Sequence, residues 1–238
     1  MNSSLIKTIK TRHSTRAPFD PQKPVAKQDL EQILEAVSWT PTAHNMQNFE
    51  VLAIDDKKLL EKIGNIKSPI SVDFIRENSK LLSFSKEELQ KKKTGILGSG
   101  FPAQWRNPNA DFAKIARESA PSPLKYTIKG SPLVLIVIYD QRKRAPASEG
   151  DVLGMISLGC VMENMWLMAE SLGISFQIMS VFSGETVEKE LKKLLSIPEF
   201  MKITYAIRLG YPLVPSTNYL RIRRKVNDFT HYNGYQNK

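Results

Sequence analysis

The hydrophobic positions of this chain follow helical spacing in some stretches and strand spacing in others. Leu30, Ile33, Leu34 and Val37 recur at intervals of three and four, which places them on one face of a helix over residues 27–38. A shorter stretch of the same kind predicts a first helix over residues 5–11. The apolar runs at 49–54 and 132–139 predict strands, and the second run, which is continuous, is typical of a strand buried on both faces.

The later part of the chain continues to alternate helices and strands. Residues 151–172 predict a long helix that is apolar around most of its circumference, and strands are expected at 174–182 and 203–211, with an amphipathic helix at 187–195 between them. Helices alternating with four or five strands indicate an α+β or α/β sandwich with a central sheet. Because the helix at 151–172 is more apolar than a monomer of this size can bury, we expect a second copy of the chain to cover part of it.

The region from residue 65 to residue 130 lacks a comparable pattern. Charged helical patches at 87–93 and 111–118 are separated by loop-like stretches rich in glycine and proline. We interpret the chain as a single domain, residues 1–238, with a variable excursion at about 65–130 that covers a site, rather than as two domains.

Composition narrows the classes of protein that this chain can be. Hydrophobic residues make up 41% of its 238 residues, enough for a core, which argues against disorder. One cysteine and three histidines without close spacing exclude a disulfide framework and a zinc cluster, so no metal site is expected. We find no membrane-length apolar stretch and no signal peptide, and therefore expect a cytoplasmic protein.

The net charge is +10, from 34 Lys and Arg against 24 Asp and Glu, which suits nucleic acid, a membrane or anionic small molecules. The segment Arg12-His13-Ser14-Thr15-Arg16 brings together two guanidinium groups, a hydroxyl and an imidazole, which suit phosphate oxygens. The same residues could instead form a solvated basic turn. Asn45 and Gln47 could hydrogen-bond the edge of a flat heteroaromatic ligand or be ordinary turn residues. The basic tail at 221–225 could bind an anion or be a solvated run of charge. No P-loop, dinucleotide fingerprint or nucleophile elbow is present.

In this combination and order, the segments resemble the nitroreductase family of FMN-dependent oxidoreductases. Arg12, His13, Ser14 and Arg16 match the family's Arg-Arg/His-Ser-x-Arg/Lys pattern. Pro41, Thr42, Asn45 and Gln47 match its Pro-Ser-x-x-Asn-x-Gln-Pro-Trp pattern, with Asn48-Phe49 in place of Pro-Trp. Residues 159–174 are similar to the family's central helix, and residues 207–212 to its closing strand with Gly-Tyr-Pro. The resemblance covers residues 5–64 and 130–233.

The resemblance implies an α+β fold with a central, mostly antiparallel sheet flanked by helices, in an intertwined homodimer with FMN sites at the interface. It implies that Arg12, His13, Ser14 and Arg16 hold the FMN phosphate, ribityl chain and part of the ring, and that Arg221 and Arg223 close on the phosphate. The loop Pro41–Gln47 would reach the flavin of the other subunit, with Thr42, Ala43 and Asn45 nearest. Met179, Ser180 and Val181 would lie near flavin N5, where some relatives have Glu-Gly.

The implied activity is ping-pong electron transfer from NADH or NADPH, through FMN, to nitroaromatic or quinone-type acceptors. The resemblance implies no catalytic side chain; Arg16 would stabilise the reduced flavin. Phe74, Phe84, Phe101, Trp105 and Phe112 could stack on a flat substrate or pack locally, and Trp39 and Trp166 would belong to the core or the dimer interface. Two alternatives stay open: a specialised flavin enzyme of the dehalogenase or flavin-cleaving type, and a basic nucleic-acid-binding protein. If the chain is an FMN-dependent oxidoreductase, we expect neither nucleic acid nor a membrane as a partner.

Overall fold

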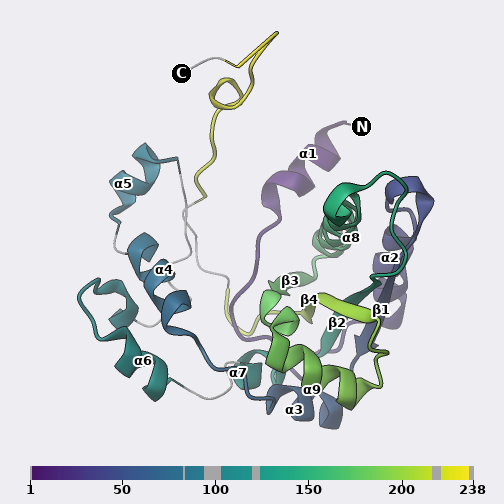
Figure 1. Ribbon diagram of the computed structural model, residues 1–238, viewed down its shortest axis with the longest axis horizontal. Coiled ribbons are helices and arrows are strands. Elements are labelled where there is room, and N and C mark those ends of the chain that lie inside the picture. Colours follow the sequence, from purple (N-terminus) through teal and green to yellow (C-terminus); the bar gives the residue numbers. More distant parts are fainter. Residues whose placement is uncertain (1, 83, 94–102, 120–123, 216–220, 236–238) are drawn as a thin grey trace. The chain divides into compact units, whose positions relative to one another are not determined.

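The chain folds into two units in a computed structural model that describes residues 2–82, 84–93, 103–119, 124–215 and 221–235. The first unit comprises residues 1–68 and 121–216, and the second comprises residues 69–120 and 217–238 (Figure 1). The excursion expected at about 65–130 therefore corresponds to residues 69–120, and the C-terminal tail belongs to the same unit as the excursion. That the excursion covers a site stays a prediction.

A sheet of four strands forms the centre of the first unit within the described residues. Its order is β1-β2-β4-β3, and every neighbouring pair is antiparallel. The predicted α+β class with a mostly antiparallel sheet is confirmed. The strands are β1 (Phe49–Ile54), β2 (Leu133–Asp140), β3 (Ser175–Met179) and β4 (Met201–Gly210).

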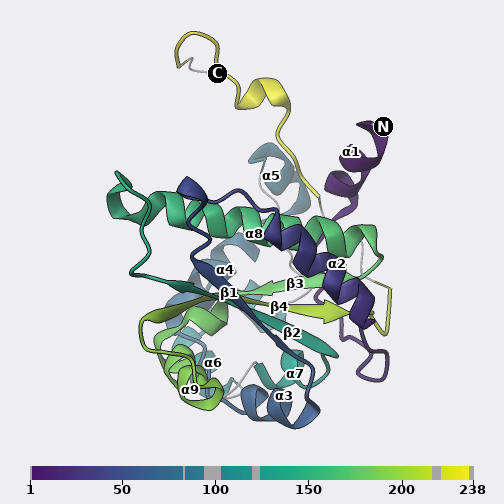
Figure 2. The same cartoon turned by 90° about the vertical axis from the view of Figure 1, so that its right-hand side faces the viewer.

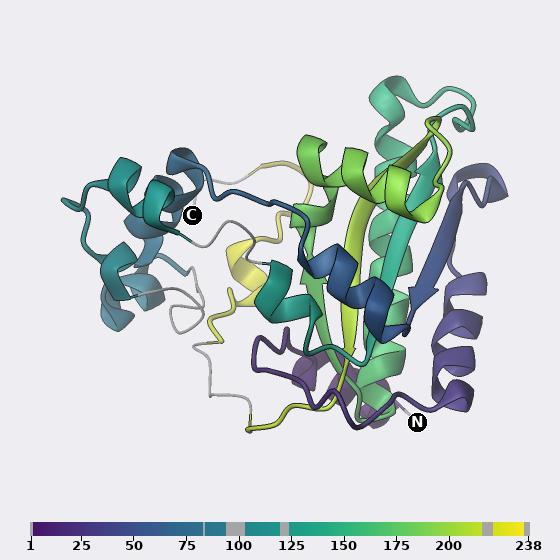
Figure 3. The same cartoon turned by 90° about the horizontal axis from the view of Figure 1, so that it is seen from below.

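Helices cover both faces of this sheet (Figures 2 and 3). Leu133, Leu135 and Val137 of β2 pack against one helical layer, whereas Val134 and Ile136 pack against the opposite one. Because successive side chains of a strand point to opposite faces, β2 is buried at all eight positions, as its continuous apolar run predicts. The first layer holds α2 (Lys27–Ser38) and α8 (Val152–Ser171), and the second holds α3 (Lys57–Gly64), α7 (Leu124–Ile128) and α9 (Glu185–Leu195).

The chain after the first helix, α1 (Asn2–Thr11), runs along the free edge of β3. Ser14 forms a parallel bridge with Phe176, and Phe19 pairs with Pro212 just beyond β4. The Thr15 N–H donates to the Phe176 carbonyl over 2.8 Å. The Arg12–Arg16 motif is therefore fixed to the sheet by main-chain hydrogen bonds and does not stand in solvent as an isolated turn.

The second unit is helical in the residues described. Its small core gathers around Ile75 and Trp105, which are 0% and 3% exposed. The Lys93 ammonium lies 2.7 Å from an Asp228 carboxylate oxygen and joins the tail to the end of α5. Its elements are α4 (Val72–Leu82), α5 (Lys86–Lys91), α6 (Phe112–Glu118) and the 3₁₀ turns η3 (Ala103–Arg106) and η6 (Val226–Asp228).

Several boundaries differ from those that the sequence predicts. The strand expected at 174–182 ends at Met179, because a 3₁₀ turn, η5 (Ser180–Ser183), follows it directly. Helix α3 includes Gly64 and is capped by Asn65, so the expected glycine cap is wrong there, whereas Gly173, with a φ of +70°, follows α8 as expected. The sequence missed α4 and α7.

The long apolar helix also qualifies one expectation. Residues Glu149–Ser171, which comprise the 3₁₀ turn η4 (Glu149–Asp151) and α8, are long enough to span a membrane, with a mean hydropathy of 1.5. A helix of membrane-spanning length and hydropathy is thus present, although the sequence has no uncharged apolar stretch of that length, because Glu163 interrupts the run. A helix of this kind also occurs in the cores of proteins without membrane spans, and here one face of α8 packs on the sheet.

Candidate functional site

The Arg12–Arg16 segment presents its side chains on alternating sides. Thr15 is 1% exposed, because its main chain bonds to β3 and its side chain turns inward. Its hydroxyl lies 3.4 Å from His13 Nε2. Arg16, the next residue, is exposed. Within this segment an inward-facing threonine is therefore followed by an outward-facing arginine that can contact a ligand.

Arg12 is oriented by helix α8. Its Nε–H donates to a Glu163 carboxylate oxygen over 2.7 Å, and its guanidinium lies 4.8 Å from the Trp166 ring centre. Trp166 in turn stacks on Phe176, with ring centres 4.9 Å apart and planes 10° from parallel. An arginine held at one nitrogen and over an aromatic face keeps its fork in a fixed direction, which suits recognition of a phosphate group.

Two buried donors beside this arginine have no partner among the residues that the structure describes. They are the Ser14 hydroxyl and the Trp166 indole N–H. Buried polar groups are nearly always hydrogen-bonded, because an unmet donor costs about 1–3 kcal/mol. Five other buried polar atoms of the described residues also lack a hydrogen-bond partner, so it is the position of these two donors near Arg12 that favours an oxygen-rich ligand at this edge of the sheet.

The Pro41–Gln47 loop has a strained main chain. His44, Asn45 and Gln47 have φ values of 51°, 52° and 43°, in the left-handed region that L residues other than Asn, Asp and Gly rarely adopt. The Gln47 amide donates to the Asn45 side-chain oxygen over 3.0 Å, and the Ala43 N–H donates to the Ser157 hydroxyl over 3.0 Å. Pro41, at the start of the loop, is exposed, and Thr42 accepts a bond from the Gln47 N–H. Strained main-chain conformations cluster at ligand sites. In this loop the bonds from Ala43 to Ser157 and from Gln47 to Thr42 hold the conformation in place.

Helix α8 keeps the loop and the Arg12 segment apart within one chain. Ser157, which receives the loop, and Glu163, which receives Arg12, are six residues apart, a rise of about 9 Å and an angular offset of about 120°. Asn164, two turns beyond Ser157 on the loop's side of the helix, donates to the Thr40 hydroxyl over 3.0 Å. The two sequence-predicted halves of the site therefore face different sides of α8.

The third predicted group, Met179-Ser180-Val181, lies at the end of β3. Met179 is 6% exposed, whereas Ser180 and Val181 are exposed at the start of η5. Ser14 bridges Phe176, three residues earlier on the same strand, so the two groups are about 10 Å apart along β3. The structure therefore brings the Arg12–Arg16 motif and the end of β3 to one edge of the sheet.

Arg221 and Arg223 belong to the second unit, and both are exposed. The Arg223 guanidinium donates to the Ile222 carbonyl over 2.8 Å. That these arginines close on the same ligand stays a prediction. Of the stacking candidates in this unit, Trp105 and Phe112 pack in the small core, Lys92 lies over Phe84, Phe74 is 46% exposed and Phe101 lies outside the described residues.

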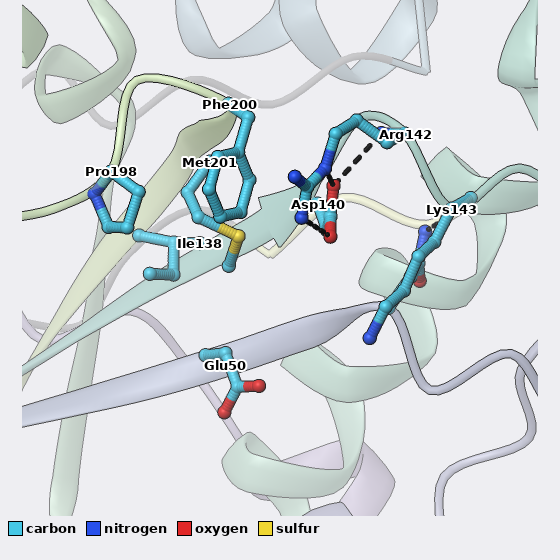
Figure 4. A pocket seen from close by; sticks show the side chains of 9 residues that line it. Glu50, Ile138, Asp140, Arg142, Lys143, Pro198, Phe200 and Met201 are labelled. Carbon is cyan, nitrogen blue, oxygen red and sulfur yellow. Dashed lines mark hydrogen bonds and ion pairs between the residues drawn. The ribbon is translucent and has the colours of Figure 1, made fainter.

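A pocket of about 360 Å³ lies where β2 ends and β4 begins, at the end of the sheet away from the Ser14–Phe176 bridge. Figure 4 shows the side chains that line this pocket. Asp140 accepts from Arg142 Nε and Nη2, both over 2.9 Å, and the Arg142 guanidinium lies 3.4 Å from the Phe200 ring centre. These bonds to Arg142 lower the pKa of Asp140 to about 2. Asn48 donates its amide to the Lys143 carbonyl. Asp140 and Arg142 thus satisfy each other at this pocket, whose lining also includes Glu50 and Lys143.

Comparison with known proteins decides the family. The model of the nitroreductase family matches residues 9–211. The chain belongs to the nitroreductase family. A protein of Archaeoglobus fulgidus named "Putative NADH dehydrogenase/NAD(P)H nitroreductase" is 25% identical over 207 residues, which are 87% of this chain and 84% of that protein.

Solved structures share the fold. An FMN-dependent nitroreductase from Clostridium difficile aligns over 97% of this chain and 99% of its own, with a TM-score of 0.58 and 19% identity. Nitroreductase A from Vibrio parahaemolyticus aligns over 99% of this chain and 78% of its own, with a TM-score of 0.60 and 18% identity. This nitroreductase-family chain is accordingly an oxidoreductase with the nitroreductase fold, and the predicted family and fold are confirmed.

Sequence reasoning missed the residues that support the motifs of this nitroreductase-family chain. Glu163 and Ser157 lie inside the apolar helix, where a polar residue among hydrophobic neighbours is a usable signal. The sequence predicts Trp166 only as a core or dimer-interface residue and does not predict its contact with Arg12. Arg208 interrupts the apolar closing strand with a charge, a stronger signal, because unpaired charged side chains are rarely buried.

Proposed function

We propose that this chain is an FMN-dependent oxidoreductase that takes electrons from NADH or NADPH and passes them to small aromatic acceptors of the nitroaromatic or quinone type. The Ser14 hydroxyl, which has no hydrogen-bond partner in the described part of the chain, carries the proposal, since it lies in the family-matching motif near an oriented arginine. The family assignment and the FMN-dependent nitroreductase of Clostridium difficile support it. The family assignment also favours flavin chemistry over nucleic-acid binding.

The donor set fits the phosphate of FMN. Ser14 and the Trp166 indole supply unmet donors, and Arg12 supplies a fixed guanidinium. When bound, FMN would supply the redox chemistry that connects oxidation of the nicotinamide to reduction of the acceptor. The chain's own residues would bind and orient the cofactor. Arg12, His13 and Ser14 would hold the phosphate end, Arg16 would place a positive charge near the ring, and Met179–Val181 would lie near the ring as well.

A homodimer would complete the site. Leu5, Ile6, Val152, Ile156 and Trp39 are between 50% and 81% exposed, on α1, α8 and the end of α2. Exposed apolar surface of this extent marks an interaction surface, and a second copy would cover it while bringing its Pro41–Gln47 loop to the Arg12 segment. This arrangement explains why the two halves face different sides of α8 within one chain. It also accounts for the apolar length of α8 without a membrane and agrees with a cytoplasmic protein.

The second unit supplies charge for the co-substrate. Its 74 residues contain 14 Lys and Arg against 7 Asp and Glu, so it holds +7 of the net +10. A positive field of this kind raises the local concentration of anionic ligands such as NADH and NADPH. We propose that this unit covers the acceptor side of the flavin and attracts the nicotinamide nucleotide, with Arg221 and Arg223 closing on the FMN phosphate.

The direct test of this function uses purified protein. It should be yellow or take up added FMN with a shift in the flavin absorption bands, and should then oxidise NADH or NADPH when menadione or nitrofurazone is present. Double-reciprocal plots at several acceptor concentrations should be parallel, as in a ping-pong cycle. A protein that neither contains nor takes up FMN would overturn the proposal.

The dimer has its own test. Ile156→Glu introduces a charge into the exposed apolar face of α8 and should convert the dimer to monomer in analytical ultracentrifugation. Leu213→Glu is the matched control, because Leu213 is 59% exposed but lies outside this face, and it should leave the dimer intact. A wild-type protein that sediments as a monomer at micromolar concentration contradicts the interface.

A further inference from the structure

Arg208 of β4 is the largest fully buried side chain in the described part of the chain, at 2% exposure. Its Nε–H donates to the Gln177 amide oxygen over 2.5 Å, and Nη2 donates to the carbonyls of Ala17 over 2.7 Å and Thr15 over 3.3 Å. Nη1 reaches the Thr127 carbonyl at 3.5 Å. The guanidinium thus joins β3, α7 and the segment that follows α1.

All four of these acceptors are neutral oxygens. The guanidinium also lies 4.1 Å from the Phe19 ring centre, which is a further interaction without negative charge. Burial lowers the pKa of Arg208 to about 10, so the group stays protonated at neutral pH. A positive charge whose bonded partners are all neutral, in a poorly screened interior, attracts anions at the nearby surface.

The bonds to Thr15 and Ala17 flank Arg16. Thr15 donates its N–H to Phe176 and offers its carbonyl to Arg208, so both of its main-chain groups face the protein. Ala17 offers its carbonyl to the same nitrogen. Because an extended chain alternates its directions, holding the residues on either side in this way leaves Arg16 facing outward.

We propose that Arg208 is a positioning residue for anion binding: it holds the Thr15 and Ala17 carbonyls so that Ser14 is presented to the phosphate end of the cofactor while Arg16 faces outward, and it adds a buried positive charge behind Ser14. The inference rests on the proposed FMN function. It assigns the role to a residue of the closing strand, about 190 positions after the motif that it orients.

Comparing FMN with riboflavin, which lacks the phosphate, tests this role. Equilibrium dissociation constants for both are measured by flavin fluorescence on wild type, Arg208→Gln and Ile207→Val. Arg208→Gln should weaken FMN binding by about tenfold or more, the scale of a hydrogen bond to a charged group, while riboflavin binding changes by less than about threefold. Ile207 is a buried neighbour on the same strand, and its variant should change neither affinity by more than about twofold.

The outcomes separate the two proposals. Wild type that binds neither flavin overturns the FMN function itself. Wild type that binds FMN, with Arg208→Gln weakening FMN and riboflavin by the same factor, refutes the positioning role, because a purely structural residue would act on both ligands alike.

Two further variants keep the test decisive if Arg208→Gln does not fold. Arg208→Lys retains the charge, but an ammonium cannot hold both carbonyls and Gln177 in a fixed fork, so FMN affinity should still fall; wild-type affinity contradicts the proposal. Gln177→Leu removes only the acceptor of Nε and should weaken FMN binding about threefold without changing riboflavin binding. An unchanged FMN affinity would contradict the proposal again.

Discussion

Two arginines at opposite ends of the central sheet, Arg142 and Arg208, have opposite surroundings. At the Asp140 end, Arg142 pairs with a carboxylate through two nitrogens and keeps 61% of its side chain exposed. At the Ser14 end, Arg208 is 2% exposed and its bonded acceptors are all neutral. The charge of Arg142 is neutralised by Asp140, whereas the charge of Arg208 is not neutralised by its bonded partners and can attract anions at the nearby surface.

This difference shows that a pocket alone does not indicate an anion-binding site. The pocket of about 360 Å³ lies at the neutralised end, whereas the unmet donors of Ser14 and Trp166 lie at the other end. A ligand gains most where it completes hydrogen bonds that the free protein leaves unmade, because those donors have already lost their water. We therefore propose that anions bind at the Ser14 end.

The largest expected effect comes from removing one arginine from each end. Arg12→Ala should weaken FMN binding on the order of 30-fold or more, since a fixed guanidinium forms strong charge-assisted bonds to phosphate. Arg142→Ala is the matched control and should change FMN affinity by less than about twofold. Fluorescence titration of both variants decides the point, and equal losses would remove the distinction between the two ends.

A smaller effect is expected from the hydroxyl itself. Ser14→Ala should weaken FMN binding by about tenfold, yet leave the free energy of unfolding within about 0.5 kcal/mol of wild type, because the hydroxyl has no described partner to lose. Ser157→Ala is the contrasting variant: its hydroxyl accepts from Ala43 and donates to Leu153, so its loss should cost about 1 kcal/mol. Urea denaturation of both apo proteins measures this. A Ser14→Ala protein as destabilised as Ser157→Ala would mean that Ser14 is structural.

The smallest effect concerns pH at the Asp140 end. The folded-state pKa of Asp140, about 2, lies below its ordinary value of about 3.9, so its ion pair stabilises the fold above that ordinary value and loses this contribution as the pH falls through about 2. Asp140→Asn should lower the Tm at pH 7 by a few degrees. The gap from wild type should close between pH 4 and pH 2, and FMN affinity should not change. A Tm difference that stays constant down to pH 2 would show that the carboxylate's charge is not involved.

The sequence predicted most of the sheet and the long helices, because their apolar spacing reports directly which faces are buried. It also indicated the family through the Arg12–Arg16 and Pro41–Gln47 motifs. Helix α4 and helix α7 escaped prediction, since short or polar helices owe their stability to tertiary contacts more than to pattern. The residues that position the candidate site, Arg208 and Glu163, could not be predicted, for a different reason. Arg208 meets Thr15, and Glu163 meets Arg12, only once the fold brings distant segments together.

Amide hydrogen–deuterium exchange with and without FMN tests the central claim most directly, because it reports both ends of the sheet in one experiment. If FMN binds where we propose, saturating FMN should slow exchange in residues 12–16 and 179–181 and leave residues 138–143 and 198–201 unchanged. Protection confined to 138–143 and 198–201 would place the cofactor at the Asp140 pocket and contradict the account.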